Sequence, residues 1–177
     1  MTFAYTVELL GDRHDRASFA CGIDALDRYL HQQARQDAER KVAVTYVLLP
    51  ADAPAIIAGF YTLSATSIRL ASLPPDTARK LPRYPDVPAT LIGRLAASTA
   101  HHGRGLGRHL LLDALRRSLD ASAAIGSTAV IVDAKDANAR AFYEHYGFIP
   151  FPDRSMRLFL PMKTIQALFA EVGRPRS

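Results

Sequence analysis

The stretch LIGRLAASTAHHGRGLGRHLLLDALRR, from Leu91 to Arg117, decides the fold. Its apolar start predicts a strand over Leu91–Ser98, and its regular leucines predict a helix over Gly103–Leu119. Because glycine lacks a Cβ, a ligand can approach the intervening glycine-rich turn closely. The N-terminus of the next helix adds unpaired N–H donors and a partial positive charge. The turn therefore predicts a phosphate or pyrophosphate site, with Arg104 and Arg108 at its mouth.

Two familiar phosphate-binding motifs fit this turn poorly. A P-loop requires Lys after its last glycine, but Arg108 follows Gly107. A dinucleotide-binding fold requires the spacing G-x-G-x-x-G, whereas Gly103, Gly105 and Gly107 give G-x-G-x-G. Asp133 ends the following strand as an acidic residue would in such a fold, so this test stays open. A simple tight turn without a ligand is the remaining alternative.

The flanking sequence alternates strand and helix patterns. A helix is expected over Asp24–Arg40 with Asp24 as its N-cap, and another over Ala137–Tyr146, ended by Gly147. Loops are expected at Pro50–Pro54 and in the proline-rich segment Pro74–Pro88. Further strands are expected over Ala4–Leu9, Val42–Leu49, Ala55–Ser64, Ser127–Asp133, Phe148–Phe151 and Met156–Leu160. This pattern predicts an α/β (α+β) fold whose front half is mostly antiparallel.

Composition bounds the class of protein. The 177 residues, 49% hydrophobic and 22% charged, predict one globular domain. The single cysteine, Cys21, excludes an internal disulfide framework. We expect no metal at the adjacent His101 and His102, whose side chains point apart in a turn. No signal peptide or membrane span is recognised, which favours a cytoplasmic protein. The net charge of +5 favours anionic partners.

The turn resembles motif A of the GNAT acetyltransferases, Q/R-x-x-G-x-G/A, with His102 in place of Gln or Arg. The resemblance implies the GNAT fold, a central mixed, mostly antiparallel sheet flanked by helices, as a single domain over 1–177. It also implies acetyl-CoA as co-substrate. The strand would hold its pantetheine and acetyl carbonyl, and the turn its pyrophosphate. The implied residues are Leu95, Ala96, Ala97, His102, Gly103, Arg104, Gly105, Leu106, Gly107 and Arg108.

A second segment, DANARAFYEHYGF from Asp136 to Phe148, resembles a family segment that ends in F-Y-x-x-x-G-F, with Phe142, Tyr143, Gly147 and Phe148 in register. The resemblance implies that Asn138 contacts the CoA arm and that Tyr143 is the catalytic general acid. A phenol beside the leaving thiolate, whose conjugate acid has a pKa of about 8.5, is chemically suited to this role. Packing on an amphipathic helix is the alternative for Tyr143 and the expectation for Tyr146.

The N-terminal segment FACGIDALDRYLHQQA, from Phe19 to Ala34, resembles the GNAT toxins of bacterial type II toxin–antitoxin modules. The segments GFYTLSA at Gly59 and IGRLA at Ile92 also resemble that group. The resemblance implies an N-acetyltransferase that acetylates the α-amino group of aminoacyl-tRNA and inhibits translation. It further implies a ribbon–helix–helix antitoxin as partner and a homodimer.

The distribution of charge is compatible with an RNA substrate. Residues 69–94 hold five basic against two acidic side chains, and residues 154–177 hold five against one. The candidate tRNA-binding residues are Arg79, Lys80, Arg83 and Arg94. A solvated basic face is the alternative for each. Two other functions stay open, namely a GNAT enzyme acting on a small amine or a protein N-terminus, and a non-catalytic acetyl-CoA-binding regulator. We identify no general base.

Overall fold

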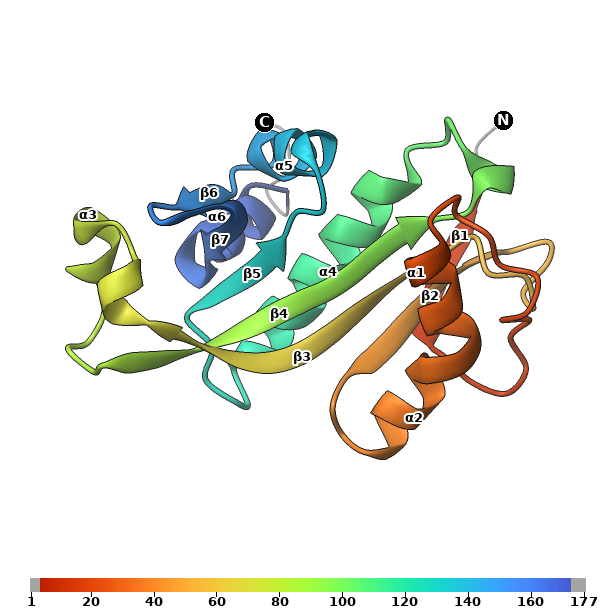
Figure 1. The fold of residues 1–177 in the computed structure, drawn as a ribbon, viewed down its shortest axis with the longest axis horizontal. Coiled ribbons are helices and arrows are strands. Elements are labelled where there is room, and N and C mark those ends of the chain that lie inside the picture. The colour runs from red at the N-terminus through yellow and green to blue at the C-terminus, as the bar shows by residue number, and fades with distance from the viewer. Residues whose placement is uncertain (1–3, 173–177) are drawn as a thin grey trace. The chain divides into compact units, whose positions relative to one another are not determined.

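The computed structural model describes residues 4–172. Its sheet has seven strands in the order β1-β2-β3-β4-β5-β7-β6. Strands β4 and β5 run parallel, whereas β1–β2, β2–β3, β5–β7 and β6–β7 are antiparallel. This confirms the expected mixed, mostly antiparallel sheet flanked by helices (Figure 1). The chain forms two compact units. The first comprises the residues up to Ser64 with Gly93–Ala114, and the second comprises Ala65–Ile92 with the residues from Leu115 onward.

The elements follow one another as strands and short helices. Their bounds are β1 Tyr5–Leu9, α1 Asp24–Arg28, η1 Tyr29–Gln33, α2 Ala34–Glu39, β2 Val44–Pro50, β3 Gly59–Arg69, η2 Leu70–Ser72, α3 Pro75–Ala78, β4 Asp86–Ala97, η3 Thr99–His101, α4 Leu106–Ser122, β5 Ala129–Asp133, α5 Ala137–His145, β6 Ile149–Phe151, β7 Arg154–Pro161 and α6 Met162–Val172.

In the first unit, the helix expected over Asp24–Arg40 is present but not uniform. A π-helical turn, η1, separates α1 from α2, and the three form one coil in Figure 1. The prediction that Asp24 is the N-cap was wrong, because Ile23 holds that position without a side-chain hydrogen bond. Asp24 instead lies in the first turn, where an acidic side chain complements the helix dipole. Asp27 fixes the entry to the helix by accepting a 2.8 Å hydrogen bond from the Cys21 N–H.

The core of the first unit lies between this coil and strands β2 and β3. It is built around Phe60, whose ring meets Phe19 edge-on at 5.4 Å and is stacked with Tyr29 at 6.5 Å. At Gly59 a Cβ would lie 2.8 Å from Leu110 Cδ1 and 3.0 Å from the Ala96 carbonyl oxygen. Glycine at this position therefore lets β3 pack closely against α4 and β4.

In the second unit, the ladder of β4 and β5 runs from Thr90 to Ile92, and β7 lies between β5 and β6. Three elements of this unit differ from the sequence expectations. The proline-rich segment Pro74–Pro88 contains α3 and the start of β4, and α6 had not been expected. The side chains in the core of the second unit are largely aromatic and β-branched, including Ile68, Val87, Ile131, Phe151 and Phe159. Within residues 4–172, no helix is long and apolar enough to cross a membrane.

Candidate active site

The glycine-rich turn adopts a conformation that only glycine accommodates readily. Gly103 and Gly105 have φ values of +77° and +69°, and a Cβ at either position would meet no atom within 4 Å. Helix α4 therefore begins at Leu106 and not at Gly103 as predicted, because the left-handed residues cannot join an α-helix. The His109 N–H makes a helical bond to the Gly105 carbonyl at 3.2 Å. The amides of the first helical turn, Leu106 to Arg108, point beyond the helix end and suit an anion.

The strand that leads into this turn is held by backbone hydrogen bonds within the first unit. The Ser98 N–H donates to the Ala58 carbonyl at 2.8 Å, and the Thr99 N–H donates to the Ala20 carbonyl at 2.9 Å. The Ser98 hydroxyl caps η3 by accepting from the Ala100 N–H at 3.2 Å. These bonds fix the end of β4 relative to the turn, so that Leu95–Ala97 and the glycine loop share one rigid support.

Positive charge surrounds the turn. A cavity of about 590 Å³ opens beside it, lined by Arg104, Gly105, Arg108, His109, Leu112 and Asp113. The Arg104 guanidinium donates to the Tyr5 hydroxyl at 3.2 Å, and Arg108 is exposed. His102 is exposed. Burial and then Arg104 lower the pKa of His101, so this imidazole is neutral near pH 7. The donors and the open space fit a diphosphate.

The predicted acetyl-binding strand residues lie at the end of β4. The β4–β5 ladder stops at Ile92, so Leu95, Ala96 and Ala97 lie beyond the paired residues. Ala96 is buried and its neighbours are half-buried. Strand N–H and C=O groups without a partner on one edge suit an extended chain with amide groups, such as pantetheine. The structure thus brings together the strand and turn residues that the sequence predicted.

Tyr143 and Asn138 belong to the second unit, on α5. Asp136 caps this helix by accepting a 2.8 Å bond from the Ala139 N–H, and Gly147, at φ +93°, follows its end. Asn138 is exposed in the first turn. These caps define the short helix that carries the predicted catalytic tyrosine.

The Tyr143 ring packs against other aromatic rings, whereas its hydroxyl is not engaged in a hydrogen bond within residues 4–172. The side chain is 8% exposed and meets the rings of Phe142 and Phe148 at 5.3 and 5.4 Å. Its hydroxyl makes no hydrogen bond with any residue among 4–172. Burial raises the pKa of Tyr143 to about 12, so the phenol stays protonated at neutral pH. A protonated hydroxyl without a protein partner is a donor available to a ligand.

The four candidate tRNA-binding residues belong to different units. Arg79, Lys80 and Arg83 are exposed at and after α3, in the second unit, and Arg79 pairs with Asp76 at 3.5 Å. Arg94 is half-buried in the first unit, with its guanidinium carbon 3.5 Å from the centroid of the Tyr29 ring.

A group of arginines that the sequence did not single out, Arg69, Arg154 and Arg157, lines one cavity in the second unit. The basic composition of residues 154–177 was the available signal. It did not indicate that β3 and β7 bring these side chains together. The two last arginines of that segment, Arg174 and Arg176, lie outside the described residues.

Known proteins are similar to this chain over most of its length. Residues 68–150 match the model of the acetyltransferase (GNAT) domain. The protein of Sinorhizobium fredii named "Probable toxin TacT" is 34% identical over 164 residues, which are 89% of this chain and 90% of that protein. The tRNA-acetylating toxin of Mycobacterium tuberculosis is 35% identical over 162 residues, 92% of this chain and 95% of that protein.

Solved structures of similar toxins share the whole fold. AtaT complexed with acetyl-methionyl-tRNAfMet has a TM-score of 0.86 at 31% identity, covering 94% of this chain and 99% of that one. A tyrosine-to-phenylalanine mutant of AtaT, bound to the C-terminus of the antitoxin AtaR and to acetyl-CoA, has a TM-score of 0.78 at 28% identity, covering 93% and 98%. A KacTA–DNA complex has a TM-score of 0.79 at 29% identity, covering 95% and 99%. On this similarity along almost its entire length, the chain belongs to the GNAT family of tRNA-acetylating toxins.

Proposed function

We propose that this chain transfers the acetyl group of acetyl-CoA to the α-amino group of an aminoacyl-tRNA, and thereby inhibits translation as the toxin of a toxin–antitoxin pair. One observation carries the choice of acceptor, namely 35% identity to a tRNA-acetylating toxin over 92% of the chain. The AtaT structure with acetyl-methionyl-tRNAfMet supports the same acceptor. A charged-tRNA substrate would place the enzyme in the cytoplasm.

Acetyl-CoA would be held by the first unit. The left-handed glycines and the first amides of α4 suit its pyrophosphate, with Arg104 and Arg108 supplying charge. His102 and Leu106 complete this turn. The unpaired edge at Leu95–Ala97 would bind the pantetheine and donate a hydrogen bond to the acetyl carbonyl oxygen. Asn138 on α5 is our candidate for a further contact to the CoA arm.

Tyr143 would supply the proton that the departing CoA sulfur requires. The neutral amine attacks the thioester carbonyl carbon, the carbon–sulfur bond breaks, and the Tyr143 hydroxyl donates its proton to sulfur. The acetylated nitrogen then loses one proton, which returns to the Tyr143 phenolate and restores the phenol. A pKa of about 12 keeps this hydroxyl protonated throughout the neutral range. The amine of an aminoacyl ester is less basic than a lysine side chain. A fraction is therefore uncharged at neutral pH, and the scheme requires no strong general base.

An antitoxin and a second copy of the chain are the proposed protein partners. The antitoxin of the AtaT structure binds through its C-terminus, and KacTA is a DNA complex. Both support an antitoxin partner for this chain, for which we propose a ribbon–helix–helix DNA-binding part. We also propose a homodimer, the commonest closed symmetry among oligomers.

Because β3, β4 and α4 each contribute residues to both units, we treat residues 1–177 as a single GNAT domain.

Competition between acceptors tests the proposed reaction. The protein would be incubated with acetyl-CoA and equal concentrations of a charged tRNA, a polyamine and a peptide with a free N-terminus, and kcat/KM would be determined for each. We expect the charged tRNA to be preferred by several orders of magnitude. A preference for the polyamine or the peptide would replace the proposal by an ordinary GNAT activity. Acetyl-CoA binding without transfer to any acceptor would favour the non-catalytic regulator.

A further inference from the structure

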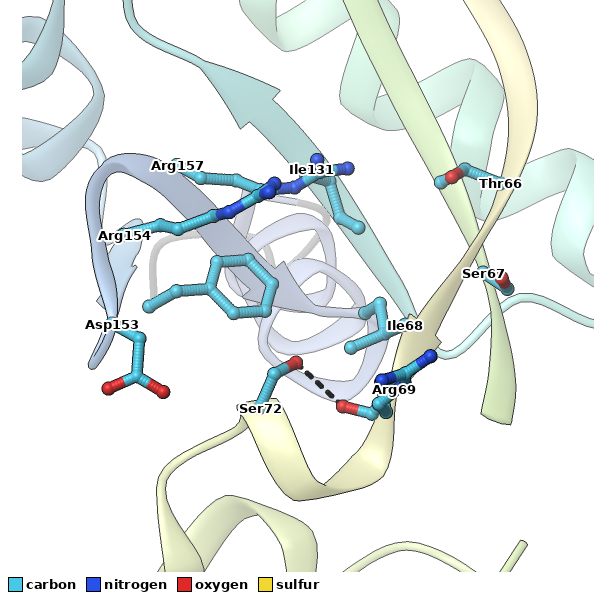
Figure 2. A pocket seen from close by; sticks show the side chains of 10 residues that line it. Thr66, Ser67, Ile68, Arg69, Ser72, Ile131, Asp153, Arg154 and Arg157 are labelled. Carbon is cyan, nitrogen blue, oxygen red and sulfur yellow. Dashed lines mark hydrogen bonds between the residues drawn. The ribbon is translucent and has the colours of Figure 1, made fainter. Parts of the chain in front are cut away.

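A cavity of about 570 Å³ in the second unit is rich in arginine (Figure 2). We call it the arginine cavity. It lies between the end of β3, the turn η2 and the hairpin of β6 and β7. Its lining residues are Thr66, Ser67, Ile68, Arg69, Ser72, Ile131, Phe151, Asp153, Arg154 and Arg157. Its volume falls in the range of small-ligand sites.

The charge of the lining is strongly positive. Arg154 and Arg157 extend into the cavity from β7, and Arg69 lies on the opposite wall, on β3 (Figure 2). Asp153 is the one acidic side chain of the lining, and in Figure 2 its carboxylate points away from Arg154 and Arg157. Gathering like charges around one space is unfavourable unless an anion occupies it.

The arginines differ in how firmly they are held. The Arg157 guanidinium lies 3.8 Å from Asp133 and 6.0 Å from the centroid of the Phe151 ring, and its side chain is 24% exposed. Arg69 and Arg154 are exposed, and neither forms an ion pair with a carboxylate among residues 4–172. One fixed and two unpaired guanidinium groups give the fork-shaped donors that bind phosphate oxygens.

The floor of the cavity is apolar. Ile68, Ile131 and Phe151 are 3%, 1% and 6% exposed. The Ser72 hydroxyl donates to the Arg69 carbonyl at 2.6 Å, which ties the end of η2 to the β3 wall. An apolar floor beneath cationic walls suits a nucleotide, whose base and sugar are less polar than its phosphate.

Strand β5 both borders the arginine cavity and precedes α5, the helix that carries the predicted catalytic tyrosine. Ile131 of β5 forms part of the floor, and Asp133 at the end of β5 pairs with Arg157. Helix α5, which carries Tyr143, begins at Ala137, shortly after that strand ends. A ligand in the cavity would therefore be positioned by the same strand that positions α5.

We propose that the arginine cavity binds a phosphate in the single-stranded 3′ end of the RNA substrate. The inference rests on the proposed function, because the aminoacyl group is attached to that end. Its phosphates are the anions that accompany the acceptor amine. The phosphates of CoA share this chemistry, and separate titrations of acetyl-CoA and of tRNA distinguish the two sources.

The test compares Arg154→Gln, Arg157→Gln and the double variant with Arg116→Gln as a matched control. Arg116 is an exposed arginine of α4 paired with Asp120 and lies outside the cavity. Three substrates are varied, namely charged tRNA, acetyl-CoA, and aminoacyl-adenosine, which carries the amine but no phosphate. Binding of deacylated tRNA is measured by fluorescence anisotropy at several KCl concentrations, and melting temperatures show whether each variant folds.

We expect the double variant to raise KM for charged tRNA on the order of tenfold or more at low salt. The salt slope of deacylated tRNA binding should become less negative by about 0.7 for each phosphate that the variant no longer neutralises. KM for acetyl-CoA and kcat/KM for aminoacyl-adenosine should stay within twofold of the wild type, as should every value for Arg116→Gln.

Three results would overturn the proposal. An equal rise of KM for acetyl-CoA would assign the cavity to a CoA phosphate, and an equal loss with aminoacyl-adenosine would assign the arginines a structural role. Unchanged binding of tRNA in a folded double variant would leave the cavity without an RNA ligand. If the wild type fails to acetylate charged tRNA, the proposed function fails, whereas the anisotropy titration still decides whether the cavity binds RNA.

Discussion

The guanidinium carbon of Arg94 lies 3.5 Å from the centroid of the Tyr29 ring, which joins β4 to the helical coil of the first unit. The Tyr29 hydroxyl continues this connection by donating to Asp37 at 2.9 Å. Arg94 immediately precedes Leu95–Ala97, the predicted acetyl-binding residues. The contact therefore braces the strand that would hold acetyl-CoA, and it gives Arg94 a structural role beside the RNA-binding role that we predicted for it.

Replacing Arg94 by Lys tests this bracing. Lysine keeps the charge but loses the flat guanidinium that lies on the ring, so the free energy of unfolding should fall by about 1 kcal/mol. Urea titration measures the change. Arg79→Lys, at an exposed ion pair, is the control and should change stability by less than about 0.5 kcal/mol. Unaltered stability of Arg94→Lys would mean that the stacked contact contributes nothing.

Gly105→Ala should weaken acetyl-CoA binding by about tenfold, because alanine costs roughly 1–2 kcal/mol at this left-handed φ of +69° and the unbound loop then favours other conformations. A Cβ at this position meets no protein atom within 4 Å, so the substitution clashes with nothing in the protein itself. Isothermal titration with acetyl-CoA measures it. The control is Gly126→Ala, where φ is not positive and the space is open. Equal affinities in the two variants would argue against the loop as the pyrophosphate site.

Tyr143→Phe should lower kcat by about a hundredfold or more while acetyl-CoA affinity stays within twofold. The substitution removes the proton donor but keeps the ring contacts to Phe142 and Phe148. The hydroxyl has no hydrogen bond to lose among residues 4–172, so the fold should be unchanged. Tyr146→Phe, one helical turn later, is the matched control and should keep its turnover. A Tyr143→Phe enzyme as fast as the wild type would remove this residue from the mechanism.

Alkaline pH should unfold the wild type more readily than Tyr143→Phe. Burial disfavours the phenolate, which raises the pKa of Tyr143 from 10.0 to about 12. Between these values the folded state binds more protons than the unfolded state, so the free energy of unfolding falls as pH rises. The loss from this residue is up to about 3 kcal/mol.

Urea titrations at pH 9, 10 and 11 measure this pH dependence. The pKa of Tyr29 is also raised to about 12, but Tyr29 is present in both proteins and cancels in the comparison. If the free energy of unfolding fell equally with pH in the wild type and the variant, the Tyr143 hydroxyl would not be desolvated.

Local chemistry made the turn and the helix ends of the candidate site predictable from the sequence. Glycines at alternate positions before a leucine stripe indicate a turn followed by a helix, and the structure has the turn at Gly103 and Gly105 and the helix from Leu106, three residues later than predicted. Asp136 and Gly147 likewise mark the ends of α5. These signals depend on residues that are near each other in the chain.

Long-range contacts were not predictable in this way. The arginine cavity unites Arg69 with Arg154 and Arg157 because β3 and β7 border one space, which no local pattern encodes. The Arg94–Tyr29 contact similarly depends on how the helical coil packs on β4. Helix α6 was also not predicted, because its start follows directly on the apolar strand β7. Periodicity alone separates two adjoining apolar elements poorly.

Transfer of labelled acetyl from acetyl-CoA to a bulk pool of charged tRNA tests the central claim most directly. The same pool, stripped of its amino acids, is the control. We predict that the label appears on the charged pool alone and remains attached to the amino acid after the ester is hydrolysed. Tight acetyl-CoA binding without transfer to charged tRNA, or equal labelling of the stripped pool, would contradict the proposed acetylation of aminoacyl-tRNA.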